Sequence, residues 1–424
     1  MHTKLHGCLV AIVLSLGLTF PVYAGDKDEG FAPLFDGHSL NGWVNVNGAP
    51  NTFYVKDGQI ITTGRPTGYL RTAKQYENFI AEFDWMHVPP APGAIGNSGF
   101  FVWADPLPAV GTGYTRGIEV QVLVNLTYKN KKGKTIATSQ GDLFGIWGAS
   151  CVPDRPHPDG WARCLPSGNF CKGANEWNHY RIEATNGVIK LAVNGHVVSG
   201  LSHCKPRKGY LALESEGSEC HFKNLKIKQL PSTHPTKDEC ADLAEGYKNL
   251  YTGLDLSGWK LAGSARKHWQ PRDNILHYSG NGRADDSLRT ARALRPAALM
   301  VDFRFPTKAD KPCSFVVYDG GKEGHLRITI SPNGRLELDC KEAVYQELSR
   351  IRYGRSRAAA HSSLKPPGQW NRMQIMQSGA TFRVAINGKV VRELHTGVSP
   401  AKGALALQPA GEMDFANLFV RQVK

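Results

Sequence analysis

The chain lacks any long hydrophobic run beyond its first residues. Only "CLVAIVLSLGLTF" (8–20) is apolar over a sustained stretch, and it is short for a membrane helix. Lys4 precedes this run, and the small-residue pattern "VYA" ends at Ala24. These features predict that residues 1–24 are a signal removed on export, with an uncleaved anchor as the alternative. We therefore expect a periplasmic or extracellular protein with no membrane span.

Cysteines at CxxC spacing are also absent, so the case for a zinc site is weak. Losing Cys8 with the signal leaves eight of the 9 cysteines, an even number that suits an oxidising compartment. Cys313 and Cys340 are the only two in the second half, and we predict that they pair. The pairing of the other six is left open by their spacing.

Acidic residues are fewer than basic residues, and the sequence contains no nucleic-acid recognition motif beside its basic clusters. Lys and Arg total 51 against 37 Asp and Glu, a formal net charge of +14. Basic residues cluster at 129–134 and at 350–357, both expected to be solvated loops. An exported protein seldom meets nucleic acid, so an anionic glycan is the better partner for the second cluster. Its arginines are Arg350, Arg352, Arg355 and Arg357.

Nowhere do apolar residues keep a helical spacing for long. The sequence instead contains an internal duplication. "LFDGHSLNGW" (34–43) returns as "LYTGLDLSGW" (250–259), and "FIAEFDW" (79–85) as "LMVDFRF" (299–305). "AVNGHV" and "AINGKV" are Asn-Gly hairpins within a longer match of 176–198 to 369–391. The sequence predicts an all-β protein with tandem antiparallel sandwiches at 30–230 and 248–424, joined by a polar linker at 231–247.

Several motifs of the first copy occur in the order of a known family. They are "LFDGxxLxGW", "YLRT", "NSGFFVW", "GIEVQVL", "GDLFGIWGA", "EWNHYRI" and "KGYLALESEGSECHFKNLKIK". Together they resemble the 3-keto-disaccharide hydrolase family, whose domains are concanavalin-like (laminin-G-like) jelly-roll sandwiches. The resemblance implies cleavage of glycosides already oxidised to a ketone at C3. One departure is that Gln140 and Trp147 stand where related sequences often carry His.

Strand parity suggests a site on one face of the first copy. In "RGIEVQVL" (116–123), Glu119 and Gln121 take the parity opposite to the apolar Ile118, Val120 and Val122. Alternation likewise groups Glu214 with Glu216, and Trp103 with Asp105. Carboxylates, amides and an aromatic ring on one concave face would suit a sugar groove. The alternative is a merely solvated face, which sandwich strands routinely carry.

Four further residues are candidates for the same site. Asp142 and His157 are proposed with Glu119 as catalytic groups or as ligands of a divalent metal, although no metal is certain. The alternatives are an Asp that caps a turn and an ordinary exposed loop histidine. Asn97 and Arg116 are expected to bind substrate hydroxyls or carbonyls, with a turn Asn and a surface Arg as alternatives.

Comparison with the second copy favours a functional site on the polar face of the first copy, because the second copy lacks the corresponding acidic residues. "GHLRITI" (324–330) is the expected counterpart of the Glu119 strand, and Gln408 and Ala410 align with Glu214 and Glu216. We expect a 3-keto-glycoside hydrolase or lyase acting by elimination and hydration. A lectin-like carbohydrate-binding protein is the first alternative. A conventional endoglycanase is weaker, because no ExDxxE-type pair of carboxylates stands on one strand.

The signal prediction can be tested directly. Expression in a bacterial host with an active secretory pathway should yield a mature protein whose first residue is Gly25. Intact-mass measurement and N-terminal sequencing of the exported material check this. Full-length protein retained in the membrane fraction would instead support the uncleaved anchor.

Overall fold

The computed structural model describes most of the chain after the predicted signal. Its described residues are 29–91, 96–124, 128–129, 133, 135–137, 141–244, 246–261, 263–280, 286–319, 325–341, 363–379, 381–395 and 402–422. The predicted signal, Gln140 and the 350–357 arginines lie outside them. The described residues contain only strands and two short 3-10 helices, η1 (Lys237–Glu239) and η2 (Gly263–His268). None of their helices is long and apolar enough to cross a membrane. The all-β prediction is confirmed.

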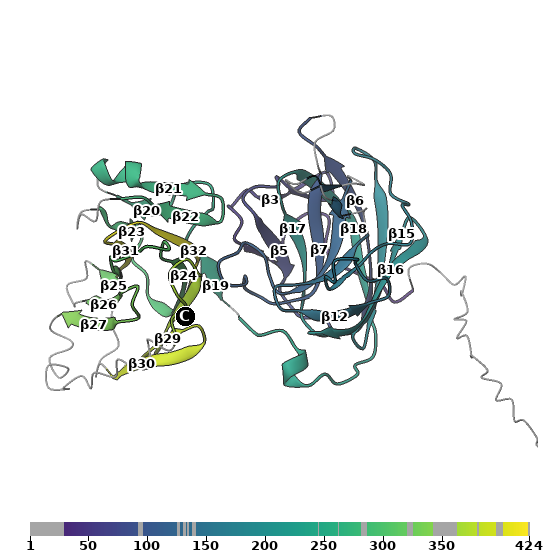
Figure 1. Cartoon of the computed structure of the whole chain (residues 1–424). Coiled ribbons are helices and arrows are strands. Elements are labelled where there is room, and N and C mark those ends of the chain that lie inside the picture. The colour runs from purple at the N-terminus through teal and green to yellow at the C-terminus, as the bar shows by residue number, and fades with distance from the viewer. Residues whose placement is uncertain are drawn as a thin grey trace, which may run out of the picture.

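The first sandwich is built from two antiparallel sheets (Figure 1). Its back sheet runs β12 (Ser150–Pro153), β16 (His196–Lys205), β15 (Val188–Val193), β14 (Asn178–Thr185), β6 (Phe79–Val88), β18 (Glu219–Gln229), β4 (Gln59–Thr62) and β3 (Phe53–Lys56), with β1 (Ala32–Pro33) beside β18. Its front sheet runs β13 (Arg163–Cys164), β11 (Leu143–Ile146), β8 (Gly117–Leu123), β7 (Asn97–Ala104), β17 (Tyr210–Ser215), β5 (Gly68–Thr72) and β2 (Trp43–Val46). A separate ribbon pairs β9 (Tyr128–Lys129) with β10 (Thr135–Ala137).

The second sandwich repeats this plan. Its back sheet runs β21 (Trp269–Arg272), β22 (Ile275–Tyr278), β32 (Met413–Gln422), β24 (Pro296–Arg304), β28 (Asn371–Ser378), β29 (Thr381–Ile386) and β30 (Lys389–His395), with β19 (Tyr247–Asn249) beside β32. Its front sheet runs β20 (Trp259–Lys260), β23 (Leu288–Thr290), β31 (Ala404–Pro409), β25 (Cys313–Asp319), β26 (His325–Ile330) and β27 (Leu336–Lys341).

Alternation of side chains places the core between each pair of sheets. Ile118, Val120 and Val122 of β8 are fully buried in the first core, as their parity predicted. The Asn-Gly pairs at 194–195 and 387–388 have positive φ at both residues, which is the type I′ geometry that tight hairpins favour.

Strand register corrects one part of the repeat alignment. Asp84 pairs with His179 in the first back sheet, and Asp302 pairs with Arg372 in the second. His179 and Arg372 are equivalent in the "WNH" and "WNR" motifs, so "FDW" (83–85) matches "VDF" (301–303). The alignment of "FIAEFDW" with "LMVDFRF" is therefore wrong by two residues. Both segments alternate apolar and other residues, so a two-residue slip preserves the pattern.

The two sandwiches pack front to back. Tyr69, Phe101 and Ala212 on the outer face of the first front sheet join Met300 and Phe419 of the second back sheet in one buried apolar cluster. In Figure 1 the second sandwich accordingly stands beside the first, with β19, β24 and β32 on the side that faces it. The outer face that carries the candidate site is thus partly covered by the second copy.

A polar network centred on Asp302 fixes this contact. The fully buried Asp302 carboxylate accepts hydrogen bonds from Arg372 (Nε, 2.7 Å), Asn417 (Nδ2, 2.6 Å) and the backbone N–H of Gly111 (2.8 Å). Arg372 and Asn417 also donate to the backbone carbonyls of Pro108 (2.7 Å) and Ala109 (3.0 Å). A loop of the first sandwich is therefore bound by a charged group of the second.

The predicted Cys313–Cys340 disulfide is not formed. Cys313 of β25 is a buried free thiol opposite Ile330, whereas Cys340 of β27 lies opposite Leu326. Strand β26 lies between the two cysteines, and their partners on it, Ile330 and Leu326, are four residues apart. This separation is far beyond the roughly 7 Å between Cα atoms that a disulfide tolerates. Being the only two cysteines of that half did not make them neighbours.

Asp302→Ala should uncouple the two sandwiches. The substitution leaves the Arg372 guanidinium without its buried carboxylate, a loss on the order of 3–5 kcal/mol. Differential scanning calorimetry should show two separate transitions in place of the coupled unfolding of the wild type. Asp84→Ala, at the equivalent but uncovered position of the first sandwich, is the matched control and should keep the transitions coupled. Coupled unfolding of Asp302→Ala at an unchanged Tm would contradict the role assigned to this network.

Candidate functional site

Polar side chains gather on the outer face of the first front sheet. The Asn97 Nδ2 atom donates to Glu216 Oε2 (2.5 Å), and Gln121 Nε2 donates to Asn97 Oδ1 (2.7 Å). Tyr114 OH donates to Glu216 Oε1 (2.8 Å). Glu119 and Glu214 complete the group from β8 and β17, the strands on either side of β7. We call Glu119, Glu214 and Glu216 the glutamate cluster.

Gly99 allows two of these carboxyl groups to approach each other. A Cβ atom added at Gly99 would lie 2.9 Å from Glu214 Oε2 and 3.0 Å from Glu119 Oε1. The side chains of Glu119 and Glu214 thus occupy the space that any other residue at 99 would fill. The cluster depends on a glycine in the strand between its members.

Burial raises the pKa of all three carboxyls of the glutamate cluster. Glu119 is 6% exposed and Glu214 is 1% exposed. Desolvation raises the pKa of Glu119 well above its ordinary value, and the charge of Glu216 adds to the effect. Desolvation and the charges of Glu216 and Glu119 do the same to the pKa of Glu214. The pKa of Glu216 is also raised by burial, although Tyr114 opposes this by hydrogen bonding. Neighbouring carboxyls that cannot all ionise suit combined acid and base catalysis.

Asp142 lies next to the cluster as one partner of an ion pair. It is fully buried and binds Arg163, whose Nε donates at 2.7 Å. Both groups act on Glu119, because Arg163 lowers the pKa of Glu119 and Asp142 raises it. Asp142 therefore holds Arg163 in place beside Glu119, a different role from the free base or turn cap that its sequence context indicated.

Aromatic rings form one wall beside the cluster. Tyr114, which binds Glu216, stacks on Trp147 with ring centroids 6.3 Å apart and an interplanar angle of 11°. Trp147 is 53% exposed, an uncommon degree for an indole. An exposed ring that continues toward buried carboxyls is suited to stack on a sugar. The residue that departs from the family pattern thus lies at this site.

Three of the sequence candidates do not lie in the cluster. The prediction that Trp103 lines the groove is wrong, because a β-bulge opposite β17 gives Trp103 a φ of 55° and turns its ring into the core. Its Nε1 donates to Glu77 O at 2.7 Å. Asp105 and Arg116 instead form an ion pair with each other, with Nε–Oδ2 at 2.7 Å and Nη2–Oδ1 at 2.9 Å.

His157 is also held elsewhere. It stacks on Trp161 with centroids 4.3 Å apart, and its Nδ1 accepts the Asp159 N–H at 3.1 Å. The proposed ligand set of Glu119, Asp142 and His157 does not converge. Over the part of the chain that is described, no three His, Cys, Asp or Glu side chains are placed to hold a metal ion.

The equivalent face of the second sandwich has different chemistry. Register places Arg327 at the position of Glu119, Gln408 at that of Glu214 and Ser314 at that of Gly99. Arg327 Nη1 donates to Gln408 Oε1, and Gln408 Nε2 donates to Ser287 at 3.1 Å. The two carboxyls have become a neutral amide and a cation bonded to each other. This face of the second copy therefore lacks the carboxyl pair of the first.

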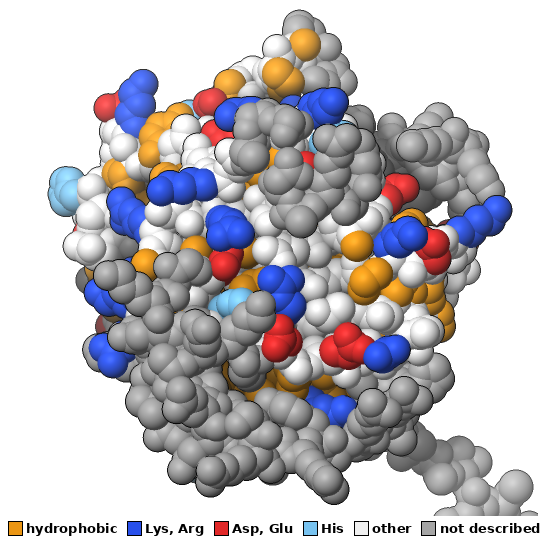
Figure 2. Space-filling model, turned by 90° about the vertical axis from the view of Figure 1, so that its left-hand side faces the viewer, with side chains coloured by type: hydrophobic (Ala, Val, Ile, Leu, Met, Phe, Trp, Pro, Cys, Tyr) orange, Lys and Arg blue, Asp and Glu red, His pale blue; other side chains and the backbone are white. Residues whose placement is uncertain are grey.

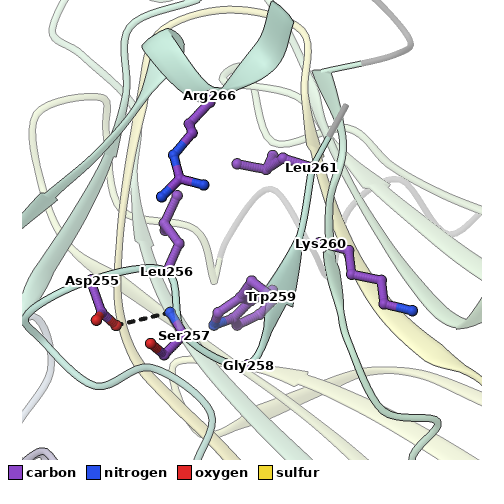
Figure 3. A pocket seen from close by; sticks show the side chains of 8 residues that line it. All are labelled: Asp255, Leu256, Ser257, Gly258, Trp259, Lys260, Leu261 and Arg266. Carbon is purple, nitrogen blue, oxygen red and sulfur yellow. Dashed lines mark hydrogen bonds between the residues drawn. The ribbon is translucent and has the colours of Figure 1, made fainter. Parts of the chain in front are cut away.

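Two other hollows lack such a cluster. One of about 580 Å³ in the second sandwich places Arg266 above the turn of Asp255 and Ser257 (Figure 3). Asp255 is the only carboxyl that lines this hollow, and hydrogen bonds from Ser257 lower its pKa. Another of about 810 Å³ lies between the sandwiches, beside Arg71 and Tyr247, and no Asp or Glu lines it. Neither offers an acid and a base together.

Comparison with known proteins identifies the class. The chain belongs to the family of 3-keto-α-glucoside-1,2-lyase-like domains, whose model matches residues 30–228 and again 246–421. This confirms the family resemblance and supports a carbohydrate-active hydrolase or lyase. A putative glycosyl hydrolase from Parabacteroides distasonis is 24% identical, with a TM-score of 0.38 over 48% of this chain and 96% of its own. A carbohydrate binding module from Bacillus subtilis is 14% identical, with a TM-score of 0.33 over 44% and 96%. No curated protein matches.

Sequence reasoning did not include Tyr114, Arg163 and Gly99 in the site. Tyr114 and Arg163 come from loops and a two-residue strand, where alternation gives no information about direction. Gly99 was visible within "NSGFF", and an isolated glycine inside a strand indicates a close approach by another group. That signal was available.

Glu214→Gln should flatten the pH dependence of stability. Because burial raises the pKa of Glu214 above its ordinary value of 4.5, the folded protein binds this proton more tightly than the unfolded chain. This stabilisation is complete below the unfolded pKa and is lost as pH rises through the folded pKa. The variant should therefore gain about 1 kcal/mol or more over wild type between about pH 5 and pH 8.

Urea unfolding across that pH range measures the effect. Glu183→Gln, on the exposed face of β14, is the control and should leave the slope unchanged. A Glu214→Gln protein with the wild-type slope would mean that Glu214 is ionised when folded.

Proposed function

We propose that this protein is exported and that its first sandwich cleaves glycosides carrying a ketone at C3 of the sugar. The observation that carries the proposal is the glutamate cluster, which is buried, is placed over Gly99 and is absent from the second copy. Membership of a 3-keto-α-glucoside-1,2-lyase-like family supports the same substrate class. The oxidation that makes the ketone would be the work of a separate redox enzyme.

Proton removal is the first step that the cluster serves. The C3 ketone acidifies the proton on C2, and an ionised carboxylate of the cluster takes it. Glu119 is our choice for this base, because burial and the adjacent Glu216 raise its pKa and so strengthen it as a proton acceptor. Arg163 limits that rise, since its charge favours the ionised form of Glu119.

Elimination then requires an acid and hydrogen-bond donors. The C2 electron pair forms the C1–C2 double bond as the C1–O bond breaks, and the leaving oxygen takes a proton from a protonated carboxyl. Glu214 is suited to this role, because its pKa is raised by burial and by its neighbours. Asn97, Gln121 and Tyr114 carry the donors that can stabilise the negative C3 oxygen. Water adds across C1 and C2 to complete net hydrolysis.

Carbohydrate binding without turnover is the second candidate function. The exposed Trp147 beside Tyr114 favours sugar stacking whether or not chemistry follows. The second sandwich, with Arg327 and Gln408 in place of the acids, fits binding better than catalysis.

Arg350, Arg352, Arg355 and Arg357 are the residues that we propose bind an anionic glycan. On the face in Figure 2, the Lys and Arg side chains that are described are spread out, and several stand beside Asp or Glu. The anionic-glycan proposal therefore rests on the 350–357 cluster.

Glu119→Gln tests the catalytic reading. Turnover of a chromogenic 3-keto-glucoside should fall by roughly 10²-fold, while the unoxidised glucoside is not cleaved by either protein. Because Glu119 is buried, the substitution can also change stability, so thermal unfolding is measured alongside turnover. Assays with and without EDTA ask separately whether a divalent metal is needed.

Two controls separate catalysis from folding. Arg327→Gln, at the equivalent position of the second copy, should retain full turnover. Val120→Ala should cost on the order of 2 kcal/mol of stability yet retain turnover at temperatures where it is folded. Full turnover by Glu119→Gln would mean that Glu119 is not the base, whereas sugar binding by the wild-type protein without any turnover would favour a binding module.

A further inference from the structure

The first back sheet carries an uncovered copy of the surface that binds the two sandwiches together. Asp84, His179 and Asn224 occupy the positions of Asp302, Arg372 and Asn417. We call Asp84, His179 and Asn224 the back-sheet triad.

The internal geometry of the two triads is the same. His179 Nδ1 lies 2.8 Å from Asp84 Oδ1, and Arg372 Nε lies 2.7 Å from Asp302 Oδ1. Asn224 and Asn417 both have positive φ, 53° and 49°, and each donates from Nδ2 to the aspartate at 2.6 Å. The duplication has therefore retained the hydrogen-bonding arrangement in both sandwiches.

In the second sandwich every member of the triad binds the 108–111 loop. Asp302 accepts the Gly111 N–H, Arg372 donates to Pro108 O, and Asn417 donates to Ala109 O. A Cβ atom on Gly111 would lie 2.1 Å from Trp370 Cγ, so this glycine packs directly on the indole. The site thus recognises a turn by one amide N–H, two carbonyls and a residue without a side chain.

The first sandwich has the matching tryptophan, and within the described ranges no turn of the chain is bound to its triad. Trp177 is equivalent to Trp370, and each ring carries a cation on one face, Lys223 at 3.8 Å and Arg304 at 4.7 Å. The Asp84 and His179 side chains are 21% and 44% exposed, against 0% and 16% for Asp302 and Arg372. A hollow of about 610 Å³ opens beside the triad, lined also by Phe31, Phe35 and Lys226.

We propose that the back-sheet triad is a docking site for a turn of a partner polypeptide. That turn would resemble 108–111, with a backbone N–H facing Asp84, carbonyls facing His179 and Asn224, and a glycine against Trp177. The proposal does not depend on the catalytic function of the front sheet.

The protein's own turn supplies the probe. A cyclised peptide of residues 105–114, "DPLPAVGTGY", should bind the full-length protein in isothermal titration calorimetry, because the second triad is already occupied within the chain. Asp84→Asn removes the charged acceptor, and Asn224→Gly keeps the positive φ while deleting the donor. Each variant should weaken binding at least tenfold.

Glu183→Gln, on the same sheet face but outside the triad, is the control and should bind as wild type. Peptide in which Gly111 is replaced by Ala should also lose binding, since its Cβ would meet Trp177. No heat of binding up to millimolar peptide would overturn the proposal, as would equal binding by Asp84→Asn. N-acetylglucosamine, which also offers an amide, is titrated in parallel, and binding of the sugar in place of the peptide would likewise overturn it.

Discussion

A buried carboxylate, Asp302, organises the relation between the two copies. It neutralises Arg372, orients Asn417 and accepts the Gly111 N–H, so a loop of the first sandwich is bound to the back of the second. Asp273 adds a second contact by accepting from both the N–H and the hydroxyl of Thr67. The charge of Asp273 also raises the pKa of Glu216. A copy that has lost its own acids therefore still influences the acids of the other.

The two front sheets differ at all three positions that form the carboxyl pair over Gly99. The core strands, register and Asn-Gly hairpins are common to both copies, whereas Glu119, Glu214 and Gly99 are replaced by Arg327, Gln408 and Ser314. Two carboxyl groups can meet over this strand only if both acidic residues are present and the residue between them is a glycine. Losing any one of the three removes the arrangement, so a common fold carries the buried carboxyl pair in one copy and not in the other.

Local backbone geometry limited what strand parity could predict. Parity correctly assigned Ile118, Val120 and Val122 to the core and Glu119 to the opposite face. It failed at Trp103, because one bulge reverses all that follows along the strand. Comparison with the family pattern marked Trp147 only as a residue that differs from the usual His. Its stacking on Tyr114 is what shows that it lies at the site.

The sequence by itself determined the all-β class, the duplication, the buried parities and the family, because these depend on patterns of residues near one another in the chain. Only the tertiary structure decided that Cys313 and Cys340 are on separated strands, that Asp105 pairs with Arg116, and that the glutamates are buried. Those outcomes depend on which strands become neighbours and on what covers them. The second back sheet covers the first front sheet through contacts between residues some 200 or more positions apart, such as Thr67 with Asp273, and no local pattern encodes such a contact.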